Sequence, residues 1–440
     1  MEKKVDGVYD GFKELGTGKM IVLGLQHVFA MFGATVLVPI LTGLSISVTL
    51  FCAGIGTIWF YFITKKKIPI FLGSSFAFLG AFASVANGDI AKIPYATLGV
   101  VCAGLLYVVL AALIAIFGPK KIMRLFPPVV TGPIIVLIGL ILSASAINNA
   151  QTNWILAILA IVVIVCTNLF GKGMIKIIPV LMGIIVSYVV GALISLVSGN
   201  ALFGLPWVDF STLAGSKIIS VPPFATYSPL PLLFGGAMDG GMAANAIITF
   251  VVVAVAAMVE HIGDICAIGA TCGKNFIADP GLTRTLLGDG IGTSLAGLFG
   301  GPANTTYSEN TGVVALTKVY DPKVMLIAAC FTIILSFISI FEAFIQTIPA
   351  SIIGGISMVL YGMISATGIR TIVENKVDFK NMRNILIAAL ILVCGLGFNT
   401  YPLVLGPIQL GGLAVAALVG IIANAVLPGK DYEFKLEDYE

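Results

Sequence analysis

Two carboxylates stand four residues apart in the apolar stretch MVEHIGDICAIGAT, at Glu260 and Asp264. Residues four apart lie on the same face of a helix. A charge at the centre of a bilayer costs about 2.5–3.5 kcal/mol on insertion scales, so ionisable residues there usually serve function. Two carboxylates this close repel each other, and we expect at least one to carry a proton part of the time. Such a pair can couple proton movement to another process.

A structural role is the alternative for this pair, with a buried carboxyl group held by neighbouring hydroxyl and amide groups. The two histidines are also open to two interpretations. His27 lies in the first apolar run and His261 beside Glu260, from which it points about 100° away around a helix. Each either carries a proton or makes structural hydrogen bonds, and we expect His27 to stabilise the first span near the site.

A third intramembrane carboxylate, Glu309, lies in the polar row PANTTYSENTGVVALTK, residues 302–318. Apolar segments flank this row on both sides. One interpretation is that the row lines a binding site. The other is that its hydroxyl and amide groups hold helices together, as is ordinary in membrane proteins.

The elements that position these residues are membrane spans. Of 440 residues, 58% are hydrophobic and 10% charged, whereas soluble domains are about a quarter charged. Runs of about 20 apolar residues recur, each long enough to cross a bilayer as a helix. We expect an all-α polytopic membrane protein with 14 spans, at 20–42, 46–64, 68–87, 95–118, 124–146, 153–171, 175–198, 242–271, 283–300, 303–319, 323–341, 347–366, 383–398 and 406–427.

The basic residues support this number of spans. With the N-terminus in the cytoplasm, 22 of the 24 lysine and arginine residues fall on the cytoplasmic side, and only Lys92 and Lys217 fall outside. Both termini are therefore expected inside the cell. Residues 1–19 contain no apolar core of a cleavable signal, so they are expected to form a cytoplasmic N-terminal segment.

A long segment at 199–241, rich in Gly, Pro and Ser, divides the chain into two halves of seven spans each. An odd number of spans per half places the halves in opposite orientation, so the sequence predicts an inverted repeat of the kind common in secondary transporters.

Spans three and ten are predicted to be interrupted. Each opens with Pro and Gly and continues with residues suited to extended backbone, as in Thr305–Thr306. Ser74–Ser75 and Ser308 then offer helix N-caps. We expect each segment to be a short strand followed by a half-helix that starts near the bilayer middle and directs free N–H groups at a cavity.

A flat ring that alternates N–H and C=O groups fits such a cavity. Carboxylates accept from ring N–H groups, half-helix N–H groups donate to ring carbonyls, and the aromatic rings of Phe76 and Tyr307 offer stacking faces. No Lys or Arg lies in the middle of a predicted span, which disfavours a strongly anionic substrate. A nucleobase such as uracil or xanthine has the required edge.

The sequence disfavours an enzyme and a metal site. The seven cysteines are scattered without CxxC spacing, and two histidines alone do not build a metal centre. The sequence contains no nucleophile–base constellation and no phosphate-binding loop. We expect no cofactor other than the proton as coupling ion, and no nucleic-acid partner.

At these residues the chain resembles the nucleobase–ascorbate transporter family (nucleobase:cation symporter-2), closest to its bacterial uracil permeases. The resemblance covers nearly the whole chain. It includes the family signature of Glu309, Asn310, Gly312, Thr317 and Lys318. The stretches that carry it are QHVFAMFGATVLVP (26–39), GSSFAF (73–78), EHIGD (260–264), DPGLTRTLLGDG (279–290) and NTTYSENTGVVALTK (304–318).

The resemblance implies a core domain at 20–118 and 242–341 that moves against a gate domain at 119–198 and 342–427. An extracellular connection at 199–241 and a cytoplasmic tail at 428–440 complete the chain. Members of the family are usually homodimers. It further implies a substrate-binding site and proton-coupled import at the cytoplasmic membrane. In the implied site, the substrate is held by Glu260 and Glu309, by the backbone at Phe76 and Ser308, and by packing against Ala34 and Tyr307. Proton coupling is assigned to Glu260, Asp264 and His27. Structural support is assigned to Ser75, Asn310 and Gly312.

Substrate choice stays open between uracil and a purine such as xanthine. Uracil permeases often carry His where Asp264 stands, and Asp there is more typical of the purine branch. Glu309 fits the uracil branch, and Ser308 replaces a Gly, which narrows the pocket. We expect a proton-coupled uracil importer that works by alternating access. A less favoured alternative from another class is an anion exchanger or channel of the same architecture.

Overall fold

The structure is a computed structural model, and the chain in it is predominantly helical. It describes residues 6–86, 88–118, 127–198, 205, 207–213, 215, 217–235, 238–406 and 408–429. The predicted N-terminal segment, the connection at 199–241 and the C-terminal tail therefore lie partly outside the described residues. The described parts of 199–241 contain three short helices, η5 (Ser211–Leu213), α10 (Phe224–Tyr227) and α11 (Leu230–Phe234).

Within the described ranges, eight helices are long and apolar enough to cross a membrane. A ninth span arises if α15 (Lys323–Ser336) and α16 (Ser339–Gln346), which meet at 79°, count as one. The prediction of a multi-pass helical membrane protein is confirmed in this form. The eight helices are α2 (Gly16–Thr42), α3 (Ile46–Ile63), α5 (Ile93–Phe117), α7 (Pro128–Ala150), α9 (Pro179–Ser198), α12 (Gly240–Cys272), α17 (Ala350–Glu374) and α18 (Met382–Thr400).

Shorter elements complete the bundle. Two of them, α8 (Trp154–Phe170) and α19 (Gly412–Val426), are apolar helices below the length of a full span. The others are η2 (Ile90–Lys92), η3 (Gly173–Ile177), the π-helical turn η6 (Ile277–Gly281) and α13 (Leu282–Leu298).

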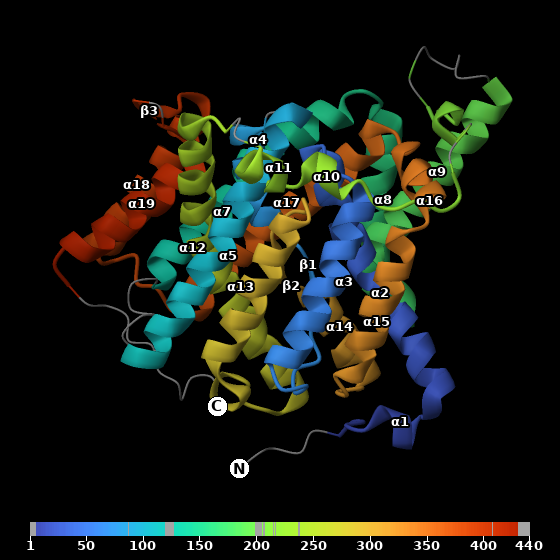
Figure 1. The fold of residues 1–440 in the computed structure, drawn as a ribbon, viewed down its shortest axis with the longest axis horizontal. Helices are drawn as coiled ribbons and strands as arrows, with labels where there is room; N and C mark the ends of the chain where they lie inside the picture. Colours follow the sequence, from blue (N-terminus) through green and yellow to red (C-terminus); the bar gives the residue numbers. More distant parts are fainter. Residues whose placement is uncertain are drawn as a thin grey trace.

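The two predicted interrupted segments each contain a strand followed by a helix. Strand β1 (Leu72–Ser74) leads into η1 (Phe76–Phe78) and α4 (Leu79–Val85), and β2 (Asn304–Thr306) leads into α14 (Ser308–Thr317). The strands pair antiparallel with Gly73 opposite Thr305. Figure 1 shows them near the middle of the molecule, enclosed by helices. Extended backbone at this depth satisfies its hydrogen bonds by this pairing, away from lipid.

Gly73 allows the second strand segment to lie close against the first. A Cβ on Gly73 would lie 2.4 Å from the ring of Tyr307, so only glycine leaves room for that ring. The Tyr307 hydroxyl donates to the carbonyl of Ser74 at 2.8 Å and accepts from the hydroxyl of Thr35 on α2 at 3.2 Å. Tyr307 is 3% exposed, and it thereby fastens both interrupted segments to α2.

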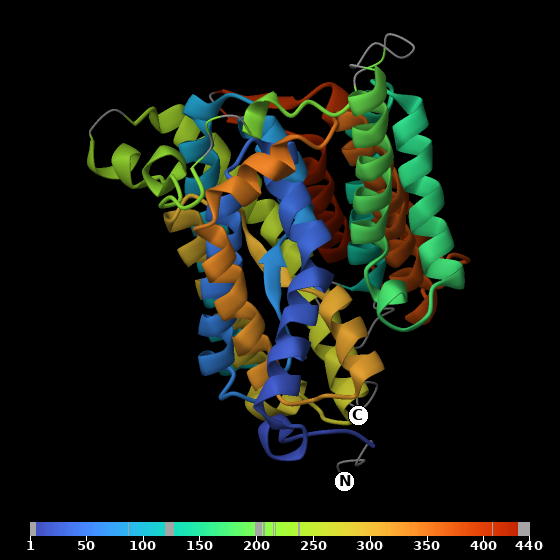
Figure 2. The same ribbon diagram turned by 90° about the vertical axis from the view of Figure 1, so that its right-hand side faces the viewer.

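The helices pack as two groups (Figure 2). One group, which we call the α12 group, is built on two sets of contacts: α12 and α13 pack on α5, and α3 packs on α13 and α15. The α12 group also includes α2, α4 and α14. In the other, the α7 group, α7 packs on α17 and α18, and α8, α9 and α19 complete it. The groups meet most extensively where α12 contacts α19 and strand β4 (Ile408–Leu410), which pairs with β3 (Leu403–Leu405).

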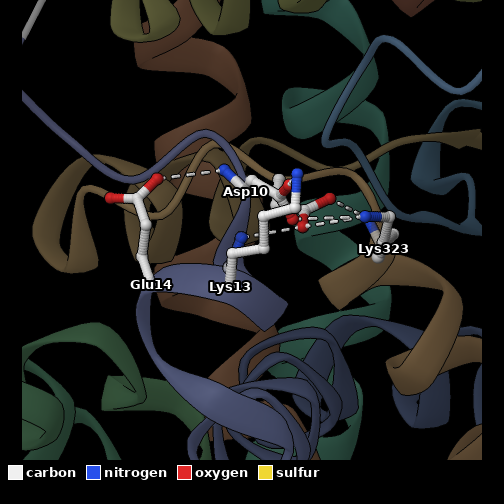
Figure 3. A network of polar contacts seen from close by, with 6 residues as sticks. Asp10, Lys13, Glu14 and Lys323 are labelled. Atoms are coloured by element: carbon white, nitrogen blue, oxygen red, sulfur yellow. Dashed lines mark hydrogen bonds and ion pairs between the residues drawn. The ribbon is translucent and has the colours of Figure 1, made fainter.

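The N-terminal segment is fastened to the α12 group. Helix α1 (Gly11–Glu14) follows an extended stretch that contains Val8. The Val8 N–H donates to the carbonyl of the residue before Val319, and the Val8 carbonyl accepts from the N–H of the residue after it. Figure 3 shows Asp10 between two ammonium groups, Lys13 at 3.2 Å and Lys323 at 3.5 Å. The hydrogen bond from Lys13 holds the pKa of the Asp10 carboxyl below its usual value. These contacts place the segment at the end of α14.

Candidate functional site

The three predicted carboxylates come from two neighbouring helices, Glu260 and Asp264 from α12 and Glu309 from α14. They lie close enough for their charges to interact. Glu260 and Glu309 are reachable by solvent-sized molecules, yet both lie deep within the molecule. A carboxylate in such a place can accept hydrogen bonds from a bound molecule.

Each helix presents a stripe of exposed small residues beside its glutamate. On α12, Gly263 and Ala267 follow Glu260 at helical spacing, and on α14, Gly312 and Ala315 follow Glu309. A Cβ at Gly263 or at Gly312 would meet no heavy atom within 4 Å. Both glutamates therefore adjoin open space. Gly312 was among the predicted site residues and Gly263 was not, although its spacing of three residues from Glu260 could have indicated it.

Asp264, in contrast, is 8% exposed and its oxygens are occupied. One accepts a hydrogen bond of 2.7 Å from the Thr306 hydroxyl, and the other accepts one of 2.6 Å from the Ser308 hydroxyl. Both donors belong to the second interrupted segment, so Asp264 ties α12 to β2 and α14. This is the arrangement foreseen in the structural alternative for Asp264. Thr306 was not among the predicted site residues.

The predicted N-caps are wrong in their chemistry. Ser75 stands at the N-cap position of η1, but its hydroxyl makes no capping bond and has no partner among the described residues. Ser308 is the first residue of α14 rather than its cap, and its hydroxyl bonds to Asp264. An N-cap hydroxyl accepts from a backbone N–H, whereas the Ser308 hydroxyl donates to a carboxylate, whose approach depends on tertiary structure. Ser74 donates at 3.4 Å to carbonyls of α2.

His27 lies within α2 and faces Asn310. The amide nitrogen of Asn310 lies 3.1 Å from Nδ1 of His27 and donates at 3.1 Å to the His27 carbonyl. Both residues are buried, at 1% and 0% exposure. The pair connects α2 to α14 directly behind Glu309, so Asn310 lies where a supporting residue was predicted.

A cavity of about 560 Å³ opens between the two helix groups and reaches Glu309. This volume is typical of sites for small molecules. Glu309 and Gly312 of α14 and Ala34 of α2 line one wall, whereas Glu260 does not line it. The opposite wall comes from the α7 group and carries Lys176 of η3, a basic residue at the start of the predicted span 175–198.

The remaining predicted substrate contacts differ in how exposed they are. Phe76 is partly exposed at the start of η1. Ser308 is exposed at the start of α14. Tyr307 is buried with its ring on Gly73, so the ring supports the strand pair instead of facing open space.

A second buried ionisable pair was missed. Nδ1 of His261 lies 3.0 Å from a carboxylate oxygen of Asp289 on α13, and both side chains are fully buried. Neither has a further hydrogen-bond partner among the described residues. Asp289 lies in the middle of α13. Nothing in the sequence spacing brings two residues 28 positions apart together.

The half-helix α14 places Glu309 in its first turn. Free N–H groups and the positive end of the helix dipole lie there. These N–H groups offer donors to a bound carbonyl oxygen. The site thus combines two accessible carboxylates with backbone donors. No group of three or more His, Cys, Asp or Glu side chains in the described ranges could hold a metal ion.

Comparisons with known proteins identify the family of the chain. The sequence pattern of the Permease family matches residues 18–404. The chain is 37% identical over 428 residues to the uracil permease of Bacillus caldolyticus, covering 94% of this chain and 93% of that one. It is 38% identical over 426 residues to the uracil permease of Bacillus subtilis (strain 168), covering 93% and 92% respectively.

The fold is also found among solved structures. The transmembrane domain of the cyanobacterial bicarbonate transporter BicA superposes with a TM-score of 0.64 at 16% identity, covering 96% of this chain and all of that domain. At this identity the likeness concerns the fold alone.

Proposed function

The chain belongs to the permease family of nucleobase–ascorbate transporters and is a transporter, not an enzyme; from this premise we propose that it imports uracil across the cytoplasmic membrane. The observation that carries the choice of substrate is the identity of 37% and 38%, over nearly the whole chain, to two uracil permeases.

The proposed substrate contacts follow from the polar groups at the site. Glu260 and Glu309 accept hydrogen bonds from the two ring N–H groups of uracil, and backbone N–H groups at the starts of η1 and α14 donate to its two carbonyls. Phe76 and Ser308 supply those backbone positions, and Ala34 packs against the ring. Both glutamates are accessible and adjoin open space, which supports this assignment.

We further propose that transport is coupled to protons and proceeds by alternating access. The α12 group acts as the core domain and the α7 group as the gate domain, and the cavity between them is one end of the pathway. Glu260 holds substrate and takes part in coupling with Asp264 and His27. The hydroxyl groups that hold Asp264 favour a role in keeping α12 and α14 in register while Glu260 changes its charge.

The proposed topology has 14 spans in two inverted repeats and both termini in the cytoplasm, as expected from the distribution of Lys and Arg. Six helical segments beyond the eight long spans are available for it: the two interrupted segments, α8, α13, α15 with α16, and α19. We also propose a homodimer with lipid around it, and no partner that is a nucleic acid.

Two alternatives remain for the test. A purine such as xanthine presents a similar hydrogen-bonding edge. Asp264 is more typical of the purine branch of the family, whereas Glu309 fits the uracil branch. Anion transport is the other alternative, because the similar fold of BicA belongs to a bicarbonate transporter. Two accessible glutamates in the site weigh against an anionic substrate, because like charges repel at close range.

Uptake of radiolabelled uracil into proteoliposomes tests the proposal. We expect accumulation when the outside is acidified, and its loss when an ionophore collapses the proton gradient. Excess unlabelled uracil should compete, and xanthine should compete weakly. Stronger competition by xanthine than by uracil would reverse the assignment of substrate, and flux that ignores the proton gradient would overturn proton coupling.

A further inference from the structure

The hairpin of β3 and β4 joins the two helix groups at the end of the molecule opposite α1 (Figure 1). Its strands pair antiparallel with Leu403 opposite Leu410 and Val404 opposite Gln409. It links α18 to α19, and a Cβ on Gly412 would lie 1.9 Å from the carbonyl oxygen of Gly395, so the two helices are in close contact. The hairpin therefore belongs to the α7 group.

One hydrogen bond crosses from the hairpin to the other group. The backbone N–H of Gln409 donates to Oδ1 of Asn245 on α12 at 3.2 Å. The Thr249 hydroxyl, one turn along α12, also donates to that oxygen at 3.4 Å. This bond is accessible to water, which can replace either partner when the groups separate.

An apolar contact accompanies this bond. Leu410 is 4% exposed and packs in a small cluster with Ala414 and Val415 of α19. Ile248 and Val252 of α12 pack against the same cluster from the other group. Asn245, Ile248 and Val252 lie at helical spacing, so one face of α12 meets the hairpin.

Beside Glu309 a cavity lies between α2 and α14 on one side and η3 and α9 on the other, although α2 also touches α9 and α14 touches η3. The contact between the groups is thus more extensive where the hairpin lies than beside Glu309. We propose that the β3–β4 hairpin is a latch that holds the two groups together, and that Leu410 and Gln409 must leave α12 before the site can open at the hairpin end. The proposal rests on the proposed function, because it requires transport by relative movement of the groups.

Cross-linking across the latch tests it. Ile248→Cys with Leu410→Cys places one thiol on each group, and a short bifunctional methanethiosulfonate reagent joins them. Leu403→Cys with Leu410→Cys is the matched control, because these residues pair within the hairpin and share one substitution. The single-cysteine variants, treated alike, account for the seven native cysteines.

Cross-linking of the Ile248–Leu410 pair should abolish uracil uptake into proteoliposomes, leave uracil binding to the detergent-solubilised protein within about twofold, and be reversed by dithiothreitol. The control pair should keep its uptake. Unchanged uptake in the cross-linked test pair, failure of that pair to cross-link, or loss of binding together with uptake would each overturn the latch. Absence of uracil uptake by the unmodified protein would instead defeat the proposed function.

A second measurement does not depend on substrate. Asn245→Ala removes the acceptor of the Gln409 N–H, and in the background of the test pair it should slow cross-linking several-fold. It should leave the rate in the control pair unchanged. An equal rate with and without Asn245→Ala would show that this bond does not hold the latch.

Discussion

The Ser308 hydroxyl donates a hydrogen bond of 2.6 Å to a carboxylate oxygen of Asp264, so the first residue of α14 is fastened to the C-terminal half of α12. Thr306 on the adjoining strand donates to the other oxygen. The same two helices carry Glu309 and Glu260. The relative position of the two proposed substrate anchors therefore depends on a buried carboxylate that is itself satisfied by protein groups.

Removing the donors to Asp264 should destabilise this junction. Thr306→Val with Ser308→Ala leaves a buried carboxylate without its hydroxyl partners, at an expected cost of about 1–3 kcal/mol. Thr271→Val is the control, because that hydroxyl is exposed and bonds only to the Ala267 carbonyl of its own helix. We expect a lower unfolding temperature in detergent and weaker uracil binding for the double variant alone. Equal unfolding temperatures for the double variant and the control would contradict this role of Asp264.

Gly73 should not tolerate a side chain. Gly73→Ala places a methyl group 2.4 Å from the Tyr307 ring, and such overpacking costs about 1–3 kcal/mol. Gly80→Ala on the following α4 is the matched control, because a Cβ there meets nothing within 4 Å. Thermal unfolding followed by the yield of monodisperse protein distinguishes them. Similar behaviour of the two variants would show that the strands can move apart at no cost.

The cavity beside Glu309 should be sensitive to volume at Gly312. Gly312→Leu extends a side chain into space that is empty in the structure, and it should raise the KM for uracil at least tenfold. Gly312→Ala adds only a methyl group that meets no neighbour, and it should change the KM little. Initial rates of uptake give both values. An unchanged KM in Gly312→Leu would place the substrate elsewhere.

The pH dependence of uptake should not come from the N-terminal network. The Asp10 carboxyl has a lowered pKa because Lys13 donates to it. The ionised carboxyl group therefore stabilises the folded state above the ordinary pKa of Asp, about 4, and this stabilisation is lost as the pH falls below that value. Asp10 is therefore ionised throughout pH 5–8. Asp10→Asn should leave the shape of the pH profile of uracil uptake in that range unaltered. A displaced profile would show that this end of the molecule takes part in coupling.

Local residue patterns were sufficient to predict the two interrupted segments. Pro and Gly before Thr305–Thr306 predict broken helices, and both segments contain a strand and a helix. Their pairing with each other, and the fit of Tyr307 on Gly73, depend on contacts between residues more than 200 positions apart. A single sequence holds no local sign of such contacts.

The polar partners show the same limit. The types and spacing of Glu260, Asp264 and Glu309 indicated an intramembrane site, because isolated carboxylates in apolar segments are costly. Their individual partners were not predictable. Local propensity predicts Ser308 as an N-cap, but in the folded chain it is the first residue of α14 and its hydroxyl donates to Asp264. Asp289 lies beside His261 only because α12 and α13 pack together.

The central claim is that Glu260 and Glu309 hold the substrate, and equilibrium binding of uracil to purified Glu260→Gln and Glu309→Gln tests it most directly. Each substitution keeps size and removes the charged acceptor, and a hydrogen bond to a charged group contributes about 1.5–3 kcal/mol. We predict that the Kd rises by about tenfold to a hundredfold or more in each variant, with Glu374→Gln on the exposed end of α17 as an unaffected control. Wild-type affinity in both glutamine variants, with the fold intact, would contradict the account.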